Sequence, residues 1–387
     1  MTGAGGARFE PDRLDDQAYL VEGDPSGMLR SVASSAAQVR AAYRSAVESG
    51  LARIGGDGRP RAIVVAGVGV SALAGDVLEA LCRYGAPVPV VTVRGHRLPG
   101  WTGAADLVIA VSRSGGTEET VAVAAEAVRR GCALVGVGAP DSPLSALVAR
   151  AGGPYVPVGG ATGVAGQPKA TLWSLLVPPI LAAAALGLVP AGESEFESVA
   201  KRLEDLAHRC RPSSESFINP GKTLALELAG TLPVIWGTSP LAAVAARRLA
   251  DRLSEDAGYP AIWGELPEAT HNQIVTFDGP LAGRDVFADP FADEPGEGVR
   301  LRLFLLRDVE EHPQVTRSRA AAVRLAEDRG VPVSEILAEG VHPLDRLAAL
   351  VGLCDYATAY LALGYGMDPA SATAATELRA RISGISQ

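Results

Sequence analysis

The sequence predicts an α/β protein of two similar subdomains, each with a mainly parallel, doubly wound sheet flanked by helices. Short apolar segments such as RAIVVAG and DLVIAVS alternate with helical stretches, which is typical of parallel strands buried on both faces. The order of strand, small-residue turn and helix at 61–81 also returns in TLPVIWGTSPLAAVAARRLADRL, from residue 231. This return indicates a weak internal repeat of a whole subdomain.

The first half is expected to begin with helices and to continue as an alternating sheet. Residues 1 to about 12 are expected to be disordered, and SGMLRSVASSAAQVRAAYRSAVESGLARI predicts one or two amphipathic helices that end at Gly55 and Gly56. Strands are predicted in RAIVVAG, VPVVTV, DLVIAVS and CALVGVG. A turn and helix are predicted in VGVSALAGDVLEALCRYG, and a further helix in TEETVAVAAEAVRRG.

A polar stretch separates the two halves. GLVPAGESEFESVAKRLEDLAHRCRPSSESFINPG is charged and rich in Ser and Pro, which predicts linking helices. Beyond it, RLRLFLL is a predicted strand and VTRSRAAAVRLAEDRG a predicted helix. The predicted division is an N-terminal tail with helices at 1–54, a first subdomain at 55–190, a linking helix at 191–211 and a second subdomain at 212–387.

The composition disfavours several classes of protein. The chain has 387 residues and a net charge of −9, which disfavours a surface for nucleic acid or anionic membrane. The five histidines show no metal-ligand spacing, so we expect no metal and no other cofactor. No apolar signal core and no C-x-x-C pair occur, which favours buried free thiols and a cytoplasmic location. The four cysteines are Cys82, Cys132, Cys210 and Cys354.

The most apolar stretch is TLWSLLVPPILAAAALGLVP, which begins at Thr171. Its length approaches that of a membrane span, but Pro178 and Pro179 interrupt it and no basic loop pattern flanks it. We therefore expect a buried helix, placed in the core or at a subunit interface, and no membrane partner.

The segment VSRSGGTEET, at 111–120, combines hydroxyls and glycines where a buried strand ends and a helix begins. A helix N-terminus leaves backbone N–H groups unpaired and carries partial positive charge, and glycines let a ligand approach closely. The segment is therefore a candidate phosphate cradle. The alternative is that Ser114 or Thr117 is an ordinary N-cap beside a tight turn. The missing lysine argues against a P-loop.

These motifs resemble the sugar isomerase (SIS) fold, and more closely the bifunctional phosphoglucose/phosphomannose isomerase family. The first turn of that family usually reads G-x-G-G-S-x-x-x-G, and residues 67–75 here read GVGVSALAG. The second reads S-Y-S-G-N-T-E-E-T, against SRSGGTEET at 112–120. The family's N-E-N-A-K and E-x-P-E-x-x-H-N correspond to SEDAG at 254–258 and ELPEATHN at 265–272. The ending CDYATAYLALGYGMDP is also similar, so the resemblance spans nearly the whole chain.

The resemblance implies aldose–ketose isomerisation of a sugar phosphate through a cis-enediol, without metal or nicotinamide. Glu255 matches the family's catalytic base, and a carboxylate in a dry cleft is suited to shuttle a proton. The alternative is a solvated glutamate at a helix end. His271 matches the ring-opening histidine, which the neighbouring subunit supplies in the family, so a homodimer is implied. The alternative is a loop histidine at the start of a helix.

The resemblance also implies how the substrate is held. Lys169 stands where the family has an arginine that is thought to stabilise the enediolate, and lysine gives a point charge without a fork. The alternative is a lysine that merely begins a helix. The implied phosphate ligands lie in the two turns of the first half and are Gly69, Ser71, Ser112, Ser114 and Thr117.

Several positions depart from the family pattern. Gly258 replaces the lysine of N-E-N-A-K, Val70 replaces a glycine, and Gly116 replaces an asparagine. Ala370 replaces the hydroxyl residue after the final DP, beside Ser371, in a region that tunes acceptance of the mannose epimer in the family. A lysine of the family's last helix corresponds to an arginine here, in a loose alignment with Arg379.

Three functions are consistent with this pattern. The first is a sugar-phosphate isomerase that interconverts fructose 6-phosphate with glucose 6-phosphate, mannose 6-phosphate or both. The second is a sugar-phosphate-binding sensor with little or no catalysis, although no basic helix-turn-helix begins the chain. The third is an amino-sugar enzyme or an epimerase on the same fold, and the absence of an N-terminal glutaminase cysteine argues against glutamine-dependent transfer.

Overall fold

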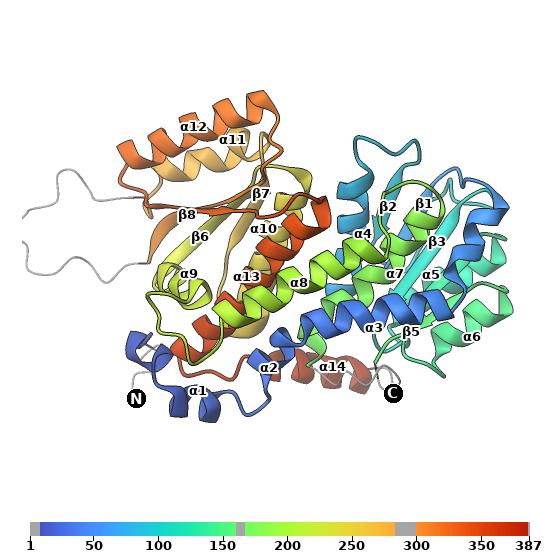
Figure 1. Cartoon of the computed structure of the whole chain (residues 1–387), viewed down its shortest axis with the longest axis horizontal. Coiled ribbons are helices and arrows are strands. Elements are labelled where there is room, and N and C mark those ends of the chain that lie inside the picture. Colours follow the sequence, from blue (N-terminus) through green and yellow to red (C-terminus); the bar gives the residue numbers. More distant parts are fainter. Residues whose placement is uncertain (1–7, 160–166, 283–298, 386–387) are drawn as a thin grey trace, which may run out of the picture.

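The structure, a computed structural model that describes residues 8–159, 167–282 and 299–385, contains two parallel sheets covered by helices (Figure 1). The first sheet has the strand order β2-β1-β3-β4-β5 and the second has the order β7-β6-β8-β9. The predicted fold class, two tandem α/β subdomains with parallel sheets, is confirmed. The strands of the first sheet are β1 (Ile63–Ala66), β2 (Val90–Val93), β3 (Leu107–Ser112), β4 (Ala133–Gly138) and β5 (Tyr155–Pro157).

The two faces of the first sheet are covered by different helices. Ile63 and Val65 of β1 pack in one core with α3, α4 and α7, whereas Val64 packs in another core with α5 and α6. Every residue of β1 and β3 is buried, as expected for strands covered on both sides. The helices are α3 (Ser35–Glu48), α4 (Val70–Cys82), α5 (Glu118–Arg129), α6 (Pro143–Arg150) and α7 (Leu172–Ala185).

The N-terminal region differs from the prediction. Residues 1–7 lie outside the described residues, but from Arg8 onward the chain is placed: Glu10 N donates to Gly364 O at 3.0 Å. The Phe9 ring lies 5.2 Å from that of Tyr365, so an aromatic contact orders a segment that was expected to be disordered. The predicted one or two helices form more pieces, and Gly55 and Gly56 lie inside the last of them. The N-terminal elements besides α3 are η1 (Pro11–Leu14), α1 (Gln17–Gly23), α2 (Met28–Ala33) and η2 (Leu51–Asp57).

The second sheet repeats this arrangement. One of its faces packs against α9, α10 and α13, and the other packs against α11, η5 and α12. Its strands are β6 (Thr231–Gly237), β7 (Ile262–Glu265), β8 (Arg300–Arg307) and β9 (Val333–Leu337). Its helical elements are α9 (Pro220–Leu228), α10 (Pro240–Ala257), α11 (Ala269–Asn272), η5 (Gln273–Asp278), α12 (Pro313–Asp328), α13 (Pro343–Gly364) and the exposed α14 (Thr373–Ile385).

Long helices join the two halves. The helix α8 (Glu193–Arg209) lies where a linking helix is predicted and packs on both α3 and α13 (Figure 1). The helix α7 and the short turn η4 (Pro168–Ala170) form from the apolar stretch around Thr171, and α7 is largely buried, as predicted.

Among the described residues, two helices are long and apolar enough to cross a membrane by length and composition alone. They are Pro168–Ala185, 61% buried over the tested window, and Pro343–Gly364, 94% buried. All four cysteines are buried and free, as the sequence predicts.

Candidate active site

The two turns predicted to hold phosphate lie side by side at the carboxyl edge of the first sheet. Because β1 and β3 are parallel neighbours, the turn from β1 into α4 adjoins the turn from β3 into α5. Gly115 has a φ of 65°, and a Cβ there would lie 2.1 Å from Ser142 Oγ, so only glycine fits. Gly69 has a φ of 57° at the start of α4.

The helices that follow these turns begin without side-chain caps. Gly69 takes the N-cap position of α4 and Thr117 that of α5, and neither supplies a side-chain cap hydrogen bond. Thr117 Oγ1 instead lies 2.9 Å from Ser112 Oγ, and Ser114 Oγ accepts from Gly116 N at 3.3 Å. Thr117 therefore occupies the N-cap position, as the alternative has it, but its side chain makes no cap hydrogen bond. In α4, however, Ser71 N and Ala72 N donate to the backbone carbonyls of Val68 and Gly69. In α5, no side chain among the described residues accepts from the first-turn N–H groups, which is the arrangement an anion needs.

The hydroxyl side chains differ in exposure. Ser112 is 1% exposed and Ser71, in the first turn of α4, is 6% exposed. Thr117 is half-buried and Ser114 is exposed. The structure thus places the four predicted hydroxyls in two adjoining turns, with Ser114 and Thr117 toward solvent.

Glu255 lies near the C-terminal end of α10 and reaches the first subdomain. Because α10 begins at the carboxyl end of β6 and runs back along the sheet, its last turn lies beyond the amino end of that sheet. There, Lys169 Nζ donates to the Glu255 carbonyl at 2.5 Å, and α10 packs against α4. The Glu255 side chain is 37% exposed, so its carboxylate is open to a ligand.

Lys169 joins three segments of the chain. Besides Glu255 O, its ammonium donates to Pro369 O and Ser371 O, both at 2.9 Å, so all three of its protons are used. Burial lowers the pKa of Lys169, with Arg252 as a further cause. The C-terminal turn that departs from the family pattern at Ala370 is thus held directly beside the candidate base.

The sequence reasoning missed a buried charge cluster behind Glu255. Arg248 Nε lies 2.9 Å from Asp355 Oδ1, and Arg252 Nη2 lies 2.7 Å from Asp256 Oδ2. Burial raises the pKa of Asp256 to about 6. A signal was present, because Arg248, Arg252 and Asp256 recur every four residues and so share the buried face of an amphipathic helix.

The structure does not bring His271 to Glu255 within one chain. His271 lies on α11, just after the carboxyl end of β7, and its side chain is exposed. The two elements also lie on opposite faces of the second sheet, since α11 shares a core with α12 and α10 does not. The 18 residues of α10 span about 27 Å, so Glu255 and His271 lie at opposite ends of the sheet. Elsewhere in this motif, Glu265 pairs with Arg83 at 2.5 Å.

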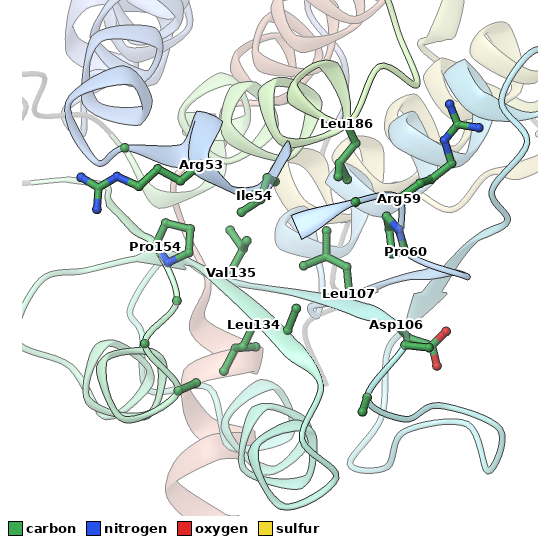
Figure 2. Close-up of a pocket in the computed structure, with 18 of the residues that line it drawn as sticks. Arg53, Ile54, Arg59, Pro60, Asp106, Leu107, Leu134, Val135, Pro154 and Leu186 are labelled. Atoms are coloured by element: carbon green, nitrogen blue, oxygen red, sulfur yellow. The ribbon is translucent and has the colours of Figure 1, made fainter. Parts of the chain in front are cut away.

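A large cavity lies at the opposite edge of the first sheet from the cradle. Its volume is about 710 Å³, and Leu107, Leu134 and Val135, near the amino ends of β3 and β4, line it (Figure 2). The guanidinium of Arg53 points away from its centre (Figure 2). Its acidic residue, Asp106, is already paired with Arg61 at 2.6 Å. Among its lining residues, the carboxylate is paired, and the hydroxyls of Ser49 and Tyr155 donate to backbone carbonyls.

This chain is similar in sequence to known sugar-phosphate isomerases. Residues 217–382 match the family described as the bacterial phospho-glucose isomerase C-terminal SIS domain. The bifunctional phosphoglucose/phosphomannose isomerase of Caldicellulosiruptor bescii is 29% identical over 311 residues, which cover 79% of this chain and 85% of that protein. The protein of the same name from Aquifex aeolicus is 27% identical over 312 residues, covering 80% and 86%.

The fold is also found among solved structures. The tagatose-6-phosphate ketose/aldose isomerase from Escherichia coli superposes with a TM-score of 0.64 at 16% identity, covering 86% of this chain and 92% of that one. An identity this low shows the fold alone. The resemblance predicted from the motifs is confirmed over most of the chain.

Proposed function

Since this chain carries a SIS domain of the bacterial phospho-glucose isomerase type and is related over most of its length to bifunctional phosphoglucose/phosphomannose isomerases, we propose that it is a sugar-phosphate isomerase. It interconverts fructose 6-phosphate with glucose 6-phosphate, mannose 6-phosphate or both. The observation that supports this most is that α10, which carries the partly exposed carboxylate of Glu255, packs against α4, whose first turn adjoins the hydroxyl-bearing turn before α5.

The proposed chemistry assigns a task to each group. The phosphate binds at the starts of α4 and α5, with Gly69 allowing close approach and Ser71, Ser112, Ser114 and Thr117 as hydroxyl ligands. Glu255 removes the proton from C2 of the open-chain aldose and returns it to C1 through the cis-enediol. Lys169 contributes positive charge beside this centre and fixes the main chain of Glu255.

We further propose that the enzyme is a homodimer in which His271 serves the partner's site. His271 is exposed and far from Glu255 of its own chain, so it can open a sugar ring only in another copy. Ile262, Trp263 and Val275 near it are exposed apolar side chains that a second copy would cover. The buried free thiols fit a cytoplasmic location.

A second function is favoured by one observation. In this structure all three protons of Lys169 go to backbone carbonyls, so its charge has no free donor for an enediolate. A protein that binds sugar phosphate as a sensor, with weak catalysis or none, would keep the hydroxyl turns and tolerate this arrangement.

The test is turnover of fructose 6-phosphate without added metal, with glucose 6-phosphate and mannose 6-phosphate followed separately. We expect Glu255→Gln to keep ligand binding and to lose about 1,000-fold or more in kcat. Asp251→Asn is the matched control, since Asp251 lies one turn earlier on the same helix, half-exposed and 3.7 Å from Arg247. Undiminished turnover in Glu255→Gln would refute the assignment. Thermal stabilisation by fructose 6-phosphate without any turnover would instead support the sensor.

A further inference from the structure

Arg252 is an enclosed cation directly behind the candidate base. It precedes Glu255 by three residues on α10, and its side chain is 0% exposed. Its Nη2 lies 2.7 Å from Asp256 Oδ2 and its Nε lies 3.5 Å from Asp355 Oδ1. Its Nη1 lies 3.8 Å from Glu255 Oε2, just beyond hydrogen-bond distance.

The guanidinium of Arg252 is short of acceptors. Within the described residues, its Nε and Nη1 are buried and form no hydrogen bond. Arg248, one turn earlier, is different: its Nε donates to Asp355 at 2.9 Å, and its Nη2 donates to both Asp355 and the Lys169 carbonyl. A buried donor without an acceptor is costly, so Arg252 Nη1 would gain from a further acceptor.

Glu255 is the group that can supply the missing acceptor. Its carboxylate is partly exposed, and it forms no hydrogen bond within residues 8–159, 167–282 and 299–385. A small rotation of this side chain would bring Oε2 into hydrogen-bond distance of Arg252 Nη1. The Glu255 carboxylate can thus turn toward the buried guanidinium on one side or toward solvent on the other.

Building on the proposed isomerase function, we propose that Arg252 is a positioning residue for Glu255: it holds the carboxylate oriented between turnovers. The guanidinium itself is buried and does not touch the substrate. A fixed partner limits the rotamers from which a base attacks.

The charges around Glu255 come from several elements and determine how the test is designed. The cations are Lys169, before α7, and Arg248 and Arg252, on α10. The other carboxylates are Asp256 on α10, Asp355 on α13 and Asp368 beyond α13. Removing Arg252 alone leaves Asp256 buried without its ion pair, which would also damage folding. Removing Arg252 and Asp256 together deletes one charge of each sign and preserves the local balance.

The experiment compares Arg252→Gln, the double variant Arg252→Gln/Asp256→Asn and the control Asp251→Asn. For each, kcat and KM for fructose 6-phosphate are measured across pH, together with thermal stability. We expect both Arg252 variants to lose about 10- to 100-fold in kcat with little change in KM. The double variant should recover most of the thermal stability without recovering kcat.

Two results would overturn this inference. If the double variant recovers wild-type kcat, Arg252 is only the counter-ion of Asp256. If Arg252→Gln folds and turns over fructose 6-phosphate at the wild-type rate, Glu255 does not need Arg252 to position it. A failure of the proposed function is distinguishable, because the wild-type protein would then show no turnover of fructose 6-phosphate. In that case the role proposed for Arg252 would also be refuted.

Discussion

The two subdomains place the same kind of turn at the same edge of their sheets, but only the first leaves it open. In the first, α4 and α5 begin without side-chain caps. In the second, Ser239 caps α10 by accepting from Ala242 N, and His312 caps α12 by accepting from Gln314 N. In α4, Ser71 N and Ala72 N donate to backbone carbonyls, so the first-turn N–H groups of α5 are the ones open to a ligand, whereas α10 and α12 each use one such N–H group for a side-chain cap.

The turn of the second subdomain also contains a carboxylate of the protein itself, that of Asp308. Ser239 Oγ donates to Asp308 Oδ2 at 2.7 Å, and Arg346 Nε lies 2.7 Å from Asp308 Oδ1. The first subdomain also has no counterpart of Glu255. Glu255 lies 18 residues after Gly237, which ends β6. The equivalent position in the first subdomain, 18 residues after Gly67, is Gly85. A repeated fold therefore does not imply a repeated site, and we expect one anion site per chain.

The largest effect on stability should follow from removing the Asp308 carboxylate. Asp308→Ala leaves the buried guanidinium of Arg346 paired with the exposed Glu310 and bonded to the Val341 carbonyl, without its buried carboxylate, so the free energy of unfolding should fall by about 3 to 5 kcal/mol. Urea denaturation measures this, and Glu310→Ala, which removes the exposed partner, should cost about 1 kcal/mol or less. The comparison of the two turns would fail if Asp308→Ala also weakened sugar-phosphate binding while the protein stayed folded.

A pH-dependent effect should mark the buried carboxylate beside the base. Because burial raises the pKa of Asp256 from 3.8 to about 6, the folded protein holds this proton more tightly than the unfolded chain does. The resulting stability is present below about pH 4 and is lost as the pH rises through 6.

Asp256→Asn does not titrate, so it should become more favourable relative to wild type between pH 4 and pH 7, by up to about 3 kcal/mol. Denaturation curves at the two pH values measure the change. A difference between the two proteins that is the same at both pH values would show that Asp256 stays ionised in the folded protein.

Substitutions in the open turn of the first subdomain should weaken substrate binding rather than reduce stability. Ser112→Ala/Thr117→Ala removes two hydroxyls that face the proposed phosphate and should lower kcat/KM for fructose 6-phosphate by about 100-fold. The matched pair in the second turn, Thr238→Ala/Ser239→Ala, should reduce stability and leave KM unchanged. Equal losses of kcat/KM in both pairs would remove the distinction between the turns.

Adjacent glycines offer the finest test of the open turn. Gly115→Ala places a Cβ at a φ of 65°, 2.1 Å from Ser142 Oγ, so the turn must shift and kcat/KM should fall by about tenfold. Gly116→Ala meets nothing within 4 Å and should change kcat/KM by less than about twofold. If Gly116→Ala were the more damaging substitution, the shape of this turn would not be what the ligand requires.

Local patterns were enough to predict the central strands and the turns of the first subdomain. The apolar runs that became β1, β3, β4 and β8 are buried on both faces and so leave a strong signal. The strands that the pattern did not indicate, β5, β7 and β9, lie at sheet edges, where one side is unpaired and fewer apolar residues are needed. Phe9 and Glu10 were misjudged because their partners are more than 350 residues away in sequence.

The candidate site was predictable only in part. The hydroxyl turns follow from strand, turn and helix order, whereas the roles of Glu255 and His271 came from the resemblance. Sequence spacing placed these two residues sixteen apart but could not show that a helix and a sheet separate them. Nor could it show that Lys169 would contact the carbonyl of Glu255, since that contact depends on how α7 and α10 pack.

The most direct test of the account is the number of sugar-phosphate molecules that each chain binds. Isothermal titration of fructose 6-phosphate into the Glu255→Gln variant separates binding from turnover. The account predicts one site per chain, and the affinity should fall when Ser112→Ala/Thr117→Ala is added. Two sites per chain, or an affinity that is insensitive to the first turn and sensitive to Thr238→Ala/Ser239→Ala, would contradict it.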